Sequence, residues 1–189
     1  DADCERLIAD AVAIHGHLDV LVNNAGIGTP SPAELEPIDG FREVVDVNLN
    51  ALFLLSQLAG SNMIERRSGS IVQVASILGM VASTPIKQAS YCASKGAVIS
   101  LTRELGCQWA RKGVRVNALA PGWFPSEMTA LMFGERADES AVDFMQRTCP
   151  MGRGGEEHEL DGALLFLASD AGSYVTGQVL AVDGGWVAR

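Results

Sequence analysis

Apolar residues follow two different spacings along this chain, and the two alternate. Spacing at every third or fourth position predicts helices, which fall at residues 3–14, 40–66, 90–112 and 156–169. Short, nearly continuous apolar runs are typical of parallel strands covered on both faces, and they fall at residues 18–23, 70–75, 114–119 and 179–182. Helices that alternate with such strands predict an α/β fold, in which a parallel sheet is covered by helices on both sides.

One further stretch, residues 127–149, is helix-prone but has an unusual composition. It is rich in methionine and phenylalanine, at Met128, Met132, Phe133, Phe144 and Met145. Flexible apolar side chains of this kind suit a lid over a substrate. They suit ordinary core packing equally well, so both interpretations stay open.

The composition narrows the class of protein. The chain has 189 residues, of which 48% are hydrophobic, enough for one domain with a sizeable core. Its net charge of −9 argues against binding to the phosphate backbone of nucleic acids. No uninterrupted apolar run reaches the roughly 18 residues of a membrane span. No signal peptide opens the chain, so neither a membrane nor a secreted location is expected.

Residues of the kinds that bind metals are scattered. The four cysteines lie far apart and form no Cys-x-x-Cys pair. This argues against a metal site or a disulfide framework, and it favours reduced thiols in the cytoplasm. His15 and His17 flank a glycine at a predicted helix end, and His158 sits among acidic residues. We interpret all three histidines as surface residues.

Candidate chemistry begins with Tyr91 and Lys95 in the predicted helix at residues 90–112. Residues four apart on a helix lie on the same face. A lysine beside a tyrosine favours the tyrosinate, so we expect the pKa of Tyr91 to fall below its ordinary value of about 10. The phenol could then donate and accept protons near neutrality. Taken alone the pair is weak evidence, because Tyr-x-x-x-Lys arises by chance on many surface helices.

Polar or small residues also stand at the ends of the predicted strands. Asn-Asn-Ala-Gly at residues 23–26 follows the first strand, Ser76 ends the second, and Pro-Gly at residues 121–122 follows the third. Asn48 interrupts the apolar face of the helix between the first two strands. Asparagine is a poor interior helix residue, so Asn48 is either a satisfied buried amide or a functional group. The two asparagines at 23–24 either tie strands together or border a ligand.

In this order the motifs resemble the short-chain dehydrogenase/reductase family, over nearly the whole chain from about residue 1 to 186. The resemblance implies a Rossmann-like, doubly wound parallel sheet and transfer of hydride between a nicotinamide, NAD or NADP, and a carbonyl or secondary alcohol. It implies a catalytic group of Asn48, Ser76, Tyr91 and Lys95. It implies that the cofactor is bound by Asn24, Ala25, Gly26, Tyr91, Lys95, Pro121, Gly122, Phe124 and Ser126, and the substrate by Ser76, Leu78, Tyr91 and Trp123.

The resemblance also implies more about the protein's setting. The Pro-Gly-Trp turn and the Asp-Gly-Gly end are most similar to the branch of 3-oxoacyl reductases and of sugar or polyol dehydrogenases. The expected partner is a small carbonyl or alcohol, with no nucleic acid and no membrane. Members associate through helices matching residues 41–66 and 90–112 and through the last strand, so a cytoplasmic homo-oligomer, a dimer or tetramer, is expected. Gly79, Met80 and Pro85 would wall the substrate pocket.

One family feature is missing from these residues. No glycine-rich phosphate loop precedes Asn23, and only 22 residues stand before it, whereas a βαβ unit needs about 30. We therefore expect residues 1–189 to form a single, N-terminally truncated domain that carries strands 4 to 7 of the family. The family's strand order would leave residues 18–23 as an exposed edge. The alternative is an inactive fragment that serves as an oligomerisation or interaction module.

Overall fold

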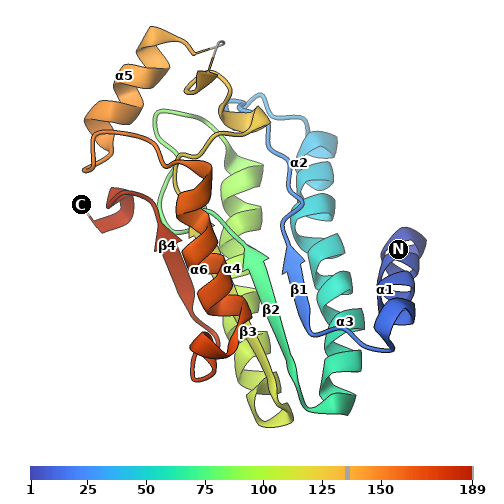
Figure 1. Ribbon diagram of the computed structural model, residues 1–189. Coiled ribbons are helices and arrows are strands. Elements are labelled where there is room, and N and C mark those ends of the chain that lie inside the picture. The colour runs from blue at the N-terminus through green and yellow to red at the C-terminus, as the bar shows by residue number, and fades with distance from the viewer. Residues whose placement is uncertain (135–136, 189) are drawn as a thin grey trace.

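The computed structural model describes residues 1–134 and 137–188, and it is built on a four-stranded parallel sheet (Figure 1). The strands are adjacent in the order in which they occur: β1 (Val20–Asn23), β2 (Gly69–Val74), β3 (Val114–Pro121) and β4 (Val179–Val182). All three pairings are parallel, with Val20 opposite Ser70 and Gly69 opposite Val114. The predicted α/β class with a parallel sheet is confirmed.

Helices fill the connections between the strands. They are α1 (Ala2–His15), α2 (Ile38–Val45), α3 (Leu52–Arg66), α4 (Ala89–Trp109), α5 (Glu139–Thr148) and α6 (Asp161–Ala168). Figure 1 shows α6 in front of the sheet and α4 behind it. The predicted helices at residues 3–14, 90–112 and 156–169 are all present, the last two with short 3-10 turns at Ala110–Lys112 and Glu157–Leu160.

The apolar core is split by the sheet. On one face, Met63 of α3 and Leu105 and Trp109 of α4 pack against Ile71 and Val116 of the strands. On the other, Val72 and Leu119 pack against Leu167 of α6. Alternate residues of a strand point to opposite faces, so a strand buried on both sides is apolar at most of its positions. This is why the central strands read as continuous apolar runs.

The helix predicted over residues 40–66 contains an irregular turn. A π-helical segment, Asp46–Ala51, separates α2 from α3, and it places Asn48 fully inside the protein. By length and composition the stretch Ile38–Arg66 could cross a membrane, and 33% of its most apolar window is buried in this structure. Here α3 packs against β1 and β2. Single π turns in α-helices are frequent at functional sites, which directs attention to Asn48.

The same helix contributes to a buried polar network beside β1. The Asn23 side-chain nitrogen donates to the oxygens of Ser56 at 3.0 Å and Gln73 at 2.9 Å, and the Gln73 nitrogen donates to Ser56 at 2.8 Å. All three residues are buried, Ser56 and Gln73 completely. Asn23 therefore ties the first two strands and α3 together, which is one of the two roles the sequence left open for the asparagine pair.

The β1 strand lies at an edge of the sheet, as expected. The side chains of Val20 and Val22 are 38% and 39% exposed, so this strand is not buried on both faces as its apolar run suggested. The reason is its position, since in the described part of the chain β1 pairs only with β2. Exposed apolar edges can pair with other chains.

We expect residues 1–189, expressed alone, to self-associate through this edge. Replacing Val22 by lysine should reduce the association, because a charge on an edge strand opposes further pairing. Size-exclusion chromatography with light scattering measures both proteins, with Ile14→Lys on the exposed side of α1 as a control for added charge. A wild-type chain that elutes as a clean monomer would contradict the prediction.

The methionine- and phenylalanine-rich stretch divides between the two roles proposed for it. Met132 and Met145 are buried in a cluster with Trp123 and Trp186, which is ordinary core packing. Met128 is 53% exposed and lines a cavity described below. Only Glu139–Thr148 forms an α-helix here, preceded by a 3-10 turn at Glu127–Thr129, and residues 135–136 lie outside the described part.

Candidate active site

The predicted Ser/Tyr/Lys group comes together at the carboxyl ends of the strands. Ser76 follows β2 and caps a 3-10 turn, where its hydroxyl accepts the Leu78 backbone N–H at 3.1 Å. Tyr91 and Lys95 lie on the first two turns of α4. The loop after Ser76 docks directly on α4 at Gly79, where a Cβ atom would lie 2.6 Å from the carbonyl carbon of Lys95. Only glycine allows this close approach.

Tyr91 is buried, 8% exposed, and hydrogen-bonds to Ser76. Burial raises the pKa of Tyr91 above 10, and the hydrogen bond to Ser76 opposes the rise without cancelling it. The expectation that Lys95 lowers this pKa is therefore wrong for the protein alone. Desolvation of the tyrosinate outweighs the other effects, and Tyr91 carries its proton at neutral pH.

Lys95 is also buried, 3% exposed, and its ammonium lies 5.7 Å from the centroid of the Tyr91 ring. The Nζ atom donates to the carbonyl oxygen of Val74 at 2.7 Å. Burial lowers the pKa of Lys95 from 10.5 to about 8, because the charged form is poorly solvated. The lysine is thus a cation near neutrality, but one that loses its proton more readily than a surface lysine.

Asn48 makes three hydrogen bonds with the elements around it. Its oxygen accepts the Ile27 backbone N–H at 2.8 Å, and its nitrogen donates to the Ile27 carbonyl at 2.9 Å and to the Ser94 hydroxyl at 3.0 Å. The amide is therefore a satisfied buried group that holds the loop after β1 against α4. A Cβ on Gly26 would lie 3.2 Å from Lys95 Nζ and 3.3 Å from Asn48 Oδ1, so the two side chains converge on one backbone segment.

A cavity of about 370 Å³ lies beside this group. It is lined by nearly all the residues that the sequence assigned to cofactor or substrate, namely Asn24, Gly26, Ser76, Leu78, Tyr91, Lys95, Pro121, Gly122, Trp123, Phe124 and Ser126. Ala25 and Asn48 do not line it. Gly79, Met80 and Pro85 do not line it either; Gly79 packs against the backbone of Lys95, and Met80 is 45% exposed.

Other residues in the lining were not expected from the sequence. They are Gly28, Pro30, Val74, Ala75, Ile77, Gln88, Pro125, Met128, Thr129 and Leu160. Gln88 could have been found from its spacing, since it stands one helical turn before Tyr91. Met128 belongs to the stretch whose composition also suited a lid, whereas Leu160 could not have been found, because it comes to the cavity from a distant part of the chain.

The turn after β3 is fixed from two sides. The Gly122 N–H donates to the Val182 carbonyl at 2.9 Å, and a Cβ there would lie 2.7 Å from the Asp183 Cα. The next residue, Trp123, packs edge-on against Trp186 with ring centroids 5.4 Å apart. The Asp183 carboxylate accepts the Gly185 and Val187 N–H groups, which closes the C-terminal turn over this aromatic pair.

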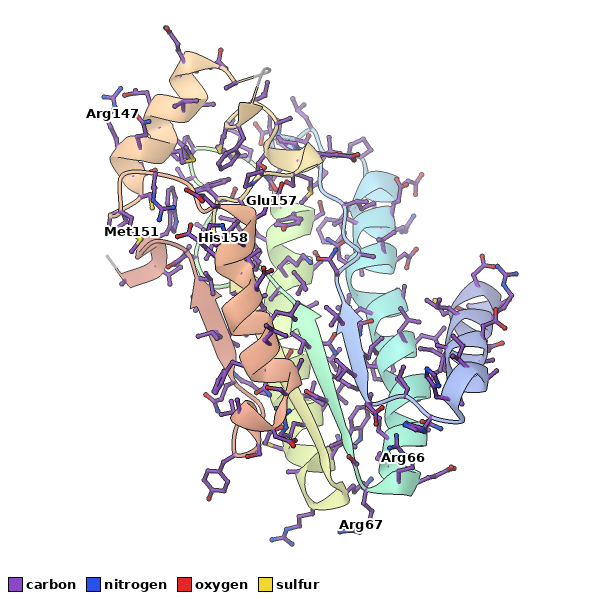
Figure 2. All side chains as sticks on the ribbon, in the orientation of Figure 1. Arg66, Arg67, Arg147, Met151, Glu157 and His158 are labelled. Carbon is purple, nitrogen blue, oxygen red and sulfur yellow. The ribbon has the colours of Figure 1, made fainter. Side chains whose placement is uncertain are left out.

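The described residues show neither a candidate metal site nor a disulfide. They contain no group of three His, Cys, Asp or Glu side chains that could hold a metal, and all four cysteines are free thiols. His158 lies at the amino end of α6 and is exposed, as predicted (Figure 2). Arg66 and Arg67 lie at the opposite end of the sheet from His158 (Figure 2).

Comparison with known proteins finds relatives over nearly the whole chain. A family model described as "Enoyl-(Acyl carrier protein) reductase" matches residues 1–187. A 2-dehydro-3-deoxy-D-gluconate 5-dehydrogenase of Bacillus subtilis is 42% identical over 172 residues, which cover 91% of this chain and 66% of that protein. Galactitol 2-dehydrogenase (L-tagatose-forming) of Cereibacter sphaeroides is 48% identical over 181 residues, covering 94% of this chain and 68% of that protein.

A solved structure matches the fold closely. It is a gluconate 5-dehydrogenase from Burkholderia cenocepacia in complex with NADP and tartrate, 37% identical, with a TM-score of 0.93. The match covers 100% of this chain and 72% of that one. The chain thus spans 66% to 72% of the length of these relatives.

Proposed function

This chain belongs to the short-chain dehydrogenase/reductase family, and from that premise we propose that the complete protein is an NAD(P)-dependent oxidoreductase. It transfers hydride between a nicotinamide and the carbon of a carbonyl or secondary alcohol. Residues 1–189 form part of one dinucleotide-binding and catalytic domain. The observation that carries the proposal is the meeting of Ser76, Tyr91 and Lys95 on one cavity, with two of the three in hydrogen-bond contact.

The surroundings of Lys95 fit the nicotinamide end of such a cofactor. Gly26 leaves bare backbone beside the Lys95 ammonium, where a side chain would take up the space. The ammonium has three donors, and one of them is used on the Val74 carbonyl, which leaves two for ribose hydroxyls. When bound, the cofactor supplies the hydride chemistry. The complex of the Burkholderia relative with NADP supports this class of cofactor, NAD or NADP.

In the direction of carbonyl reduction, Tyr91 donates its phenolic proton to the carbonyl oxygen while the carbonyl carbon gains a hydride. The Ser76 hydroxyl donates a hydrogen bond to the same oxygen and stabilises its developing negative charge. The tyrosinate left behind is stabilised by the Lys95 cation. Because the pKa of Tyr91 is raised, the tyrosine is protonated and ready for this step at neutral pH. Alcohol oxidation runs the same transfers backwards.

Asn48 is proposed to support the site without contacting the substrate. It does not line the cavity, so it does not touch the substrate, and its amide holds the Ile27 segment and Ser94 in place. In our proposal it also orders a water that relays protons to Lys95.

We further propose that the complete protein is a cytoplasmic homo-oligomer, a dimer or a tetramer. Exposed apolar side chains on the outer helices support this, since Phe53 of α3 is 41% exposed and Leu165 of α6 is 65% exposed. The substrate is a small molecule, either a polyol or sugar derivative or a 3-oxoacyl compound, as the names of the relatives, 3-oxoacyl-[acyl-carrier-protein] reductases among them, suggest.

The test is cofactor-dependent turnover by the complete protein. We expect secondary alcohols to drive reduction of NAD⁺ or NADP⁺, measured as the absorbance of the reduced nicotinamide. A parallel fluorescence titration of residues 1–189 with NADH and NADPH should give weaker binding than the complete protein gives, because these residues carry no glycine-rich phosphate loop. A folded, complete protein that binds neither cofactor and oxidises no alcohol would refute the proposal and leave the interaction module as the alternative.

A further inference from the structure

Gln88 lies at the amino end of α4, one helical turn before Tyr91, and lines the same cavity. The backbone on both sides of it is held in place. The Ser31 N–H donates to the Lys87 carbonyl at 2.8 Å, and the Ser90 hydroxyl donates to the Glu36 carboxylate. The Gln88 carbonyl accepts the Cys92 N–H at 3.0 Å, within the helix. The side chain of Gln88 therefore starts from a fixed position beside the reacting group.

The amide of Gln88 is unengaged. It does not cap its own helix, and it makes no hydrogen bond within the part of the chain that the structure describes. Among the other polar side chains of the lining, Ser126 and Thr129 bond to each other at 2.9 Å, and Asn24 is one of the residues that the resemblance assigns to the cofactor. Ser76, Tyr91 and Lys95 belong to the proposed reaction. An amide both donates and accepts hydrogen bonds, and a hydroxyl group has the same two capacities.

The charge of the lining limits the substrate as well. Among the described residues that line this cavity, Lys95 is the only cation. Another cation, Arg153, lines a separate cavity and is held by two 2.7 Å hydrogen bonds to the Glu159 carboxylate. No arginine among the described residues lines this cavity, so a substrate carboxylate bound there would have only Lys95 as a cationic partner, and burying a poorly paired charge is costly.

We propose that Gln88 determines specificity by binding a hydroxyl group next to the reacting carbon, and that the substrate is an uncharged polyol or the matching keto sugar. This inference rests on the proposed oxidoreductase function, and it favours a neutral sugar derivative over a sugar acid or a 3-oxoacyl chain. The apolar lining at Leu78, Trp123 and Leu160 would then cover the carbon skeleton.

The experiment compares three probes in the complete protein with its preferred nicotinamide cofactor. Galactitol carries neighbouring hydroxyls, gluconate adds a carboxylate, and 2-butanol has a single hydroxyl. The wild type should have a higher kcat/KM for galactitol than for gluconate. Replacing Gln88 by methionine should lower kcat/KM for galactitol about 10-fold to 100-fold, mainly through KM, because one substrate hydroxyl loses its partner. The value for 2-butanol should change less than about threefold.

Gln108→Met is the matched control, because Gln108 lies on the same helix, is exposed, and bonds only to Glu104. It should change neither value. A Gln88→Met protein that loses galactitol and 2-butanol activity equally would overturn the inference in favour of a structural role for Gln88. So would a wild type that prefers gluconate, and either result would leave the oxidoreductase function standing. Absence of turnover with all three probes would overturn that function, and this inference with it.

Discussion

We expect the Tyr91→Phe variant of the complete protein to lose alcohol oxidation by about a thousandfold or more while it remains folded. Proton transfer by a positioned side chain contributes on the order of 10²-fold to 10⁴-fold to a rate, and the phenol is the group placed to provide it here. The change removes one hydroxyl and its bond to Ser76, which costs only about 1 kcal/mol of stability. Steady-state turnover and thermal unfolding measure the two effects separately.

The chain provides its own control for this experiment. Tyr174 is the second of its two tyrosines, and its side chain is fully exposed. Tyr174→Phe should leave both turnover and stability unchanged. If Tyr91→Phe retained more than about a tenth of the wild-type rate, the assignment of Tyr91 as proton donor would be wrong.

The second large effect concerns Lys95, where stability and activity should change in opposite directions. Burial lowers the pKa of Lys95 to about 8 in the folded protein, against 10.5 ordinarily. Below pH 8 the folded state holds a poorly solvated cation, and the shift corresponds to a cost of roughly 3 kcal/mol. Between pH 8 and 10.5 the unfolded state binds more protons than the folded state, so the contribution of Lys95 to stability becomes less unfavourable as pH rises through this window.

Lys95→Met should therefore stabilise the fold at pH 7 by about 2 kcal/mol, once about 1 kcal/mol is subtracted for the lost bond to the Val74 carbonyl. The gain should shrink as the pH rises from 8 towards 10.5. Turnover should fall at least 100-fold, because the tyrosinate formed at Tyr91 loses its stabilising cation. Urea unfolding at pH 7 and at pH 10, with turnover at pH 7, tests all three statements.

Lys112→Met, at an exposed lysine beyond the end of α4, is the control and should alter neither property. A Lys95→Met protein that is less stable than the wild type at pH 7 would show that the ammonium contributes more to folding through its hydrogen bond than burial costs. Retained turnover would remove Lys95 from the proposed catalytic group.

The inner strands β2 and β3 were predictable because they lie between two layers of helices, so that most of their positions are apolar. The edge strand β1 shows the limit of this argument. Its run of residues 18–23 is as apolar as the others, yet Val20 and Val22 are exposed, because what covers a strand depends on its neighbours and not on its own sequence. The helix at residues 90–112 was clear from its spacing, and it places both Tyr91 and Lys95 at the cavity.

The sequence could not predict three features of the site. The spacing of apolar residues does not distinguish the π turn at Asp46–Ala51 from an ordinary α-helix. The only sign of it in the sequence was Asn48, a polar residue on an apolar helix face. The direction of the pKa shift of Tyr91 was predicted wrongly, because the sequence shows that Lys95 is nearby but does not show that Tyr91 is buried. The contact of Leu160 with the cavity depends on how loops fold back from afar, which local patterns do not encode.

The buried amides beside β1 also limit how the chain can be wrongly folded. Sliding a strand by one residue turns every side chain to the opposite face. If β1 slipped in this way, Asn23 would leave the interior, and Ser56 and Gln73 would lose its side chain as a partner in a dry environment. Each unsatisfied group costs about 1 to 3 kcal/mol, whereas an all-valine run would pair almost as well out of register. The network thus selects the native register. It adds little to the stability of the native state, but it raises the free energy of a misaligned sheet, which an apolar edge strand alone would tolerate.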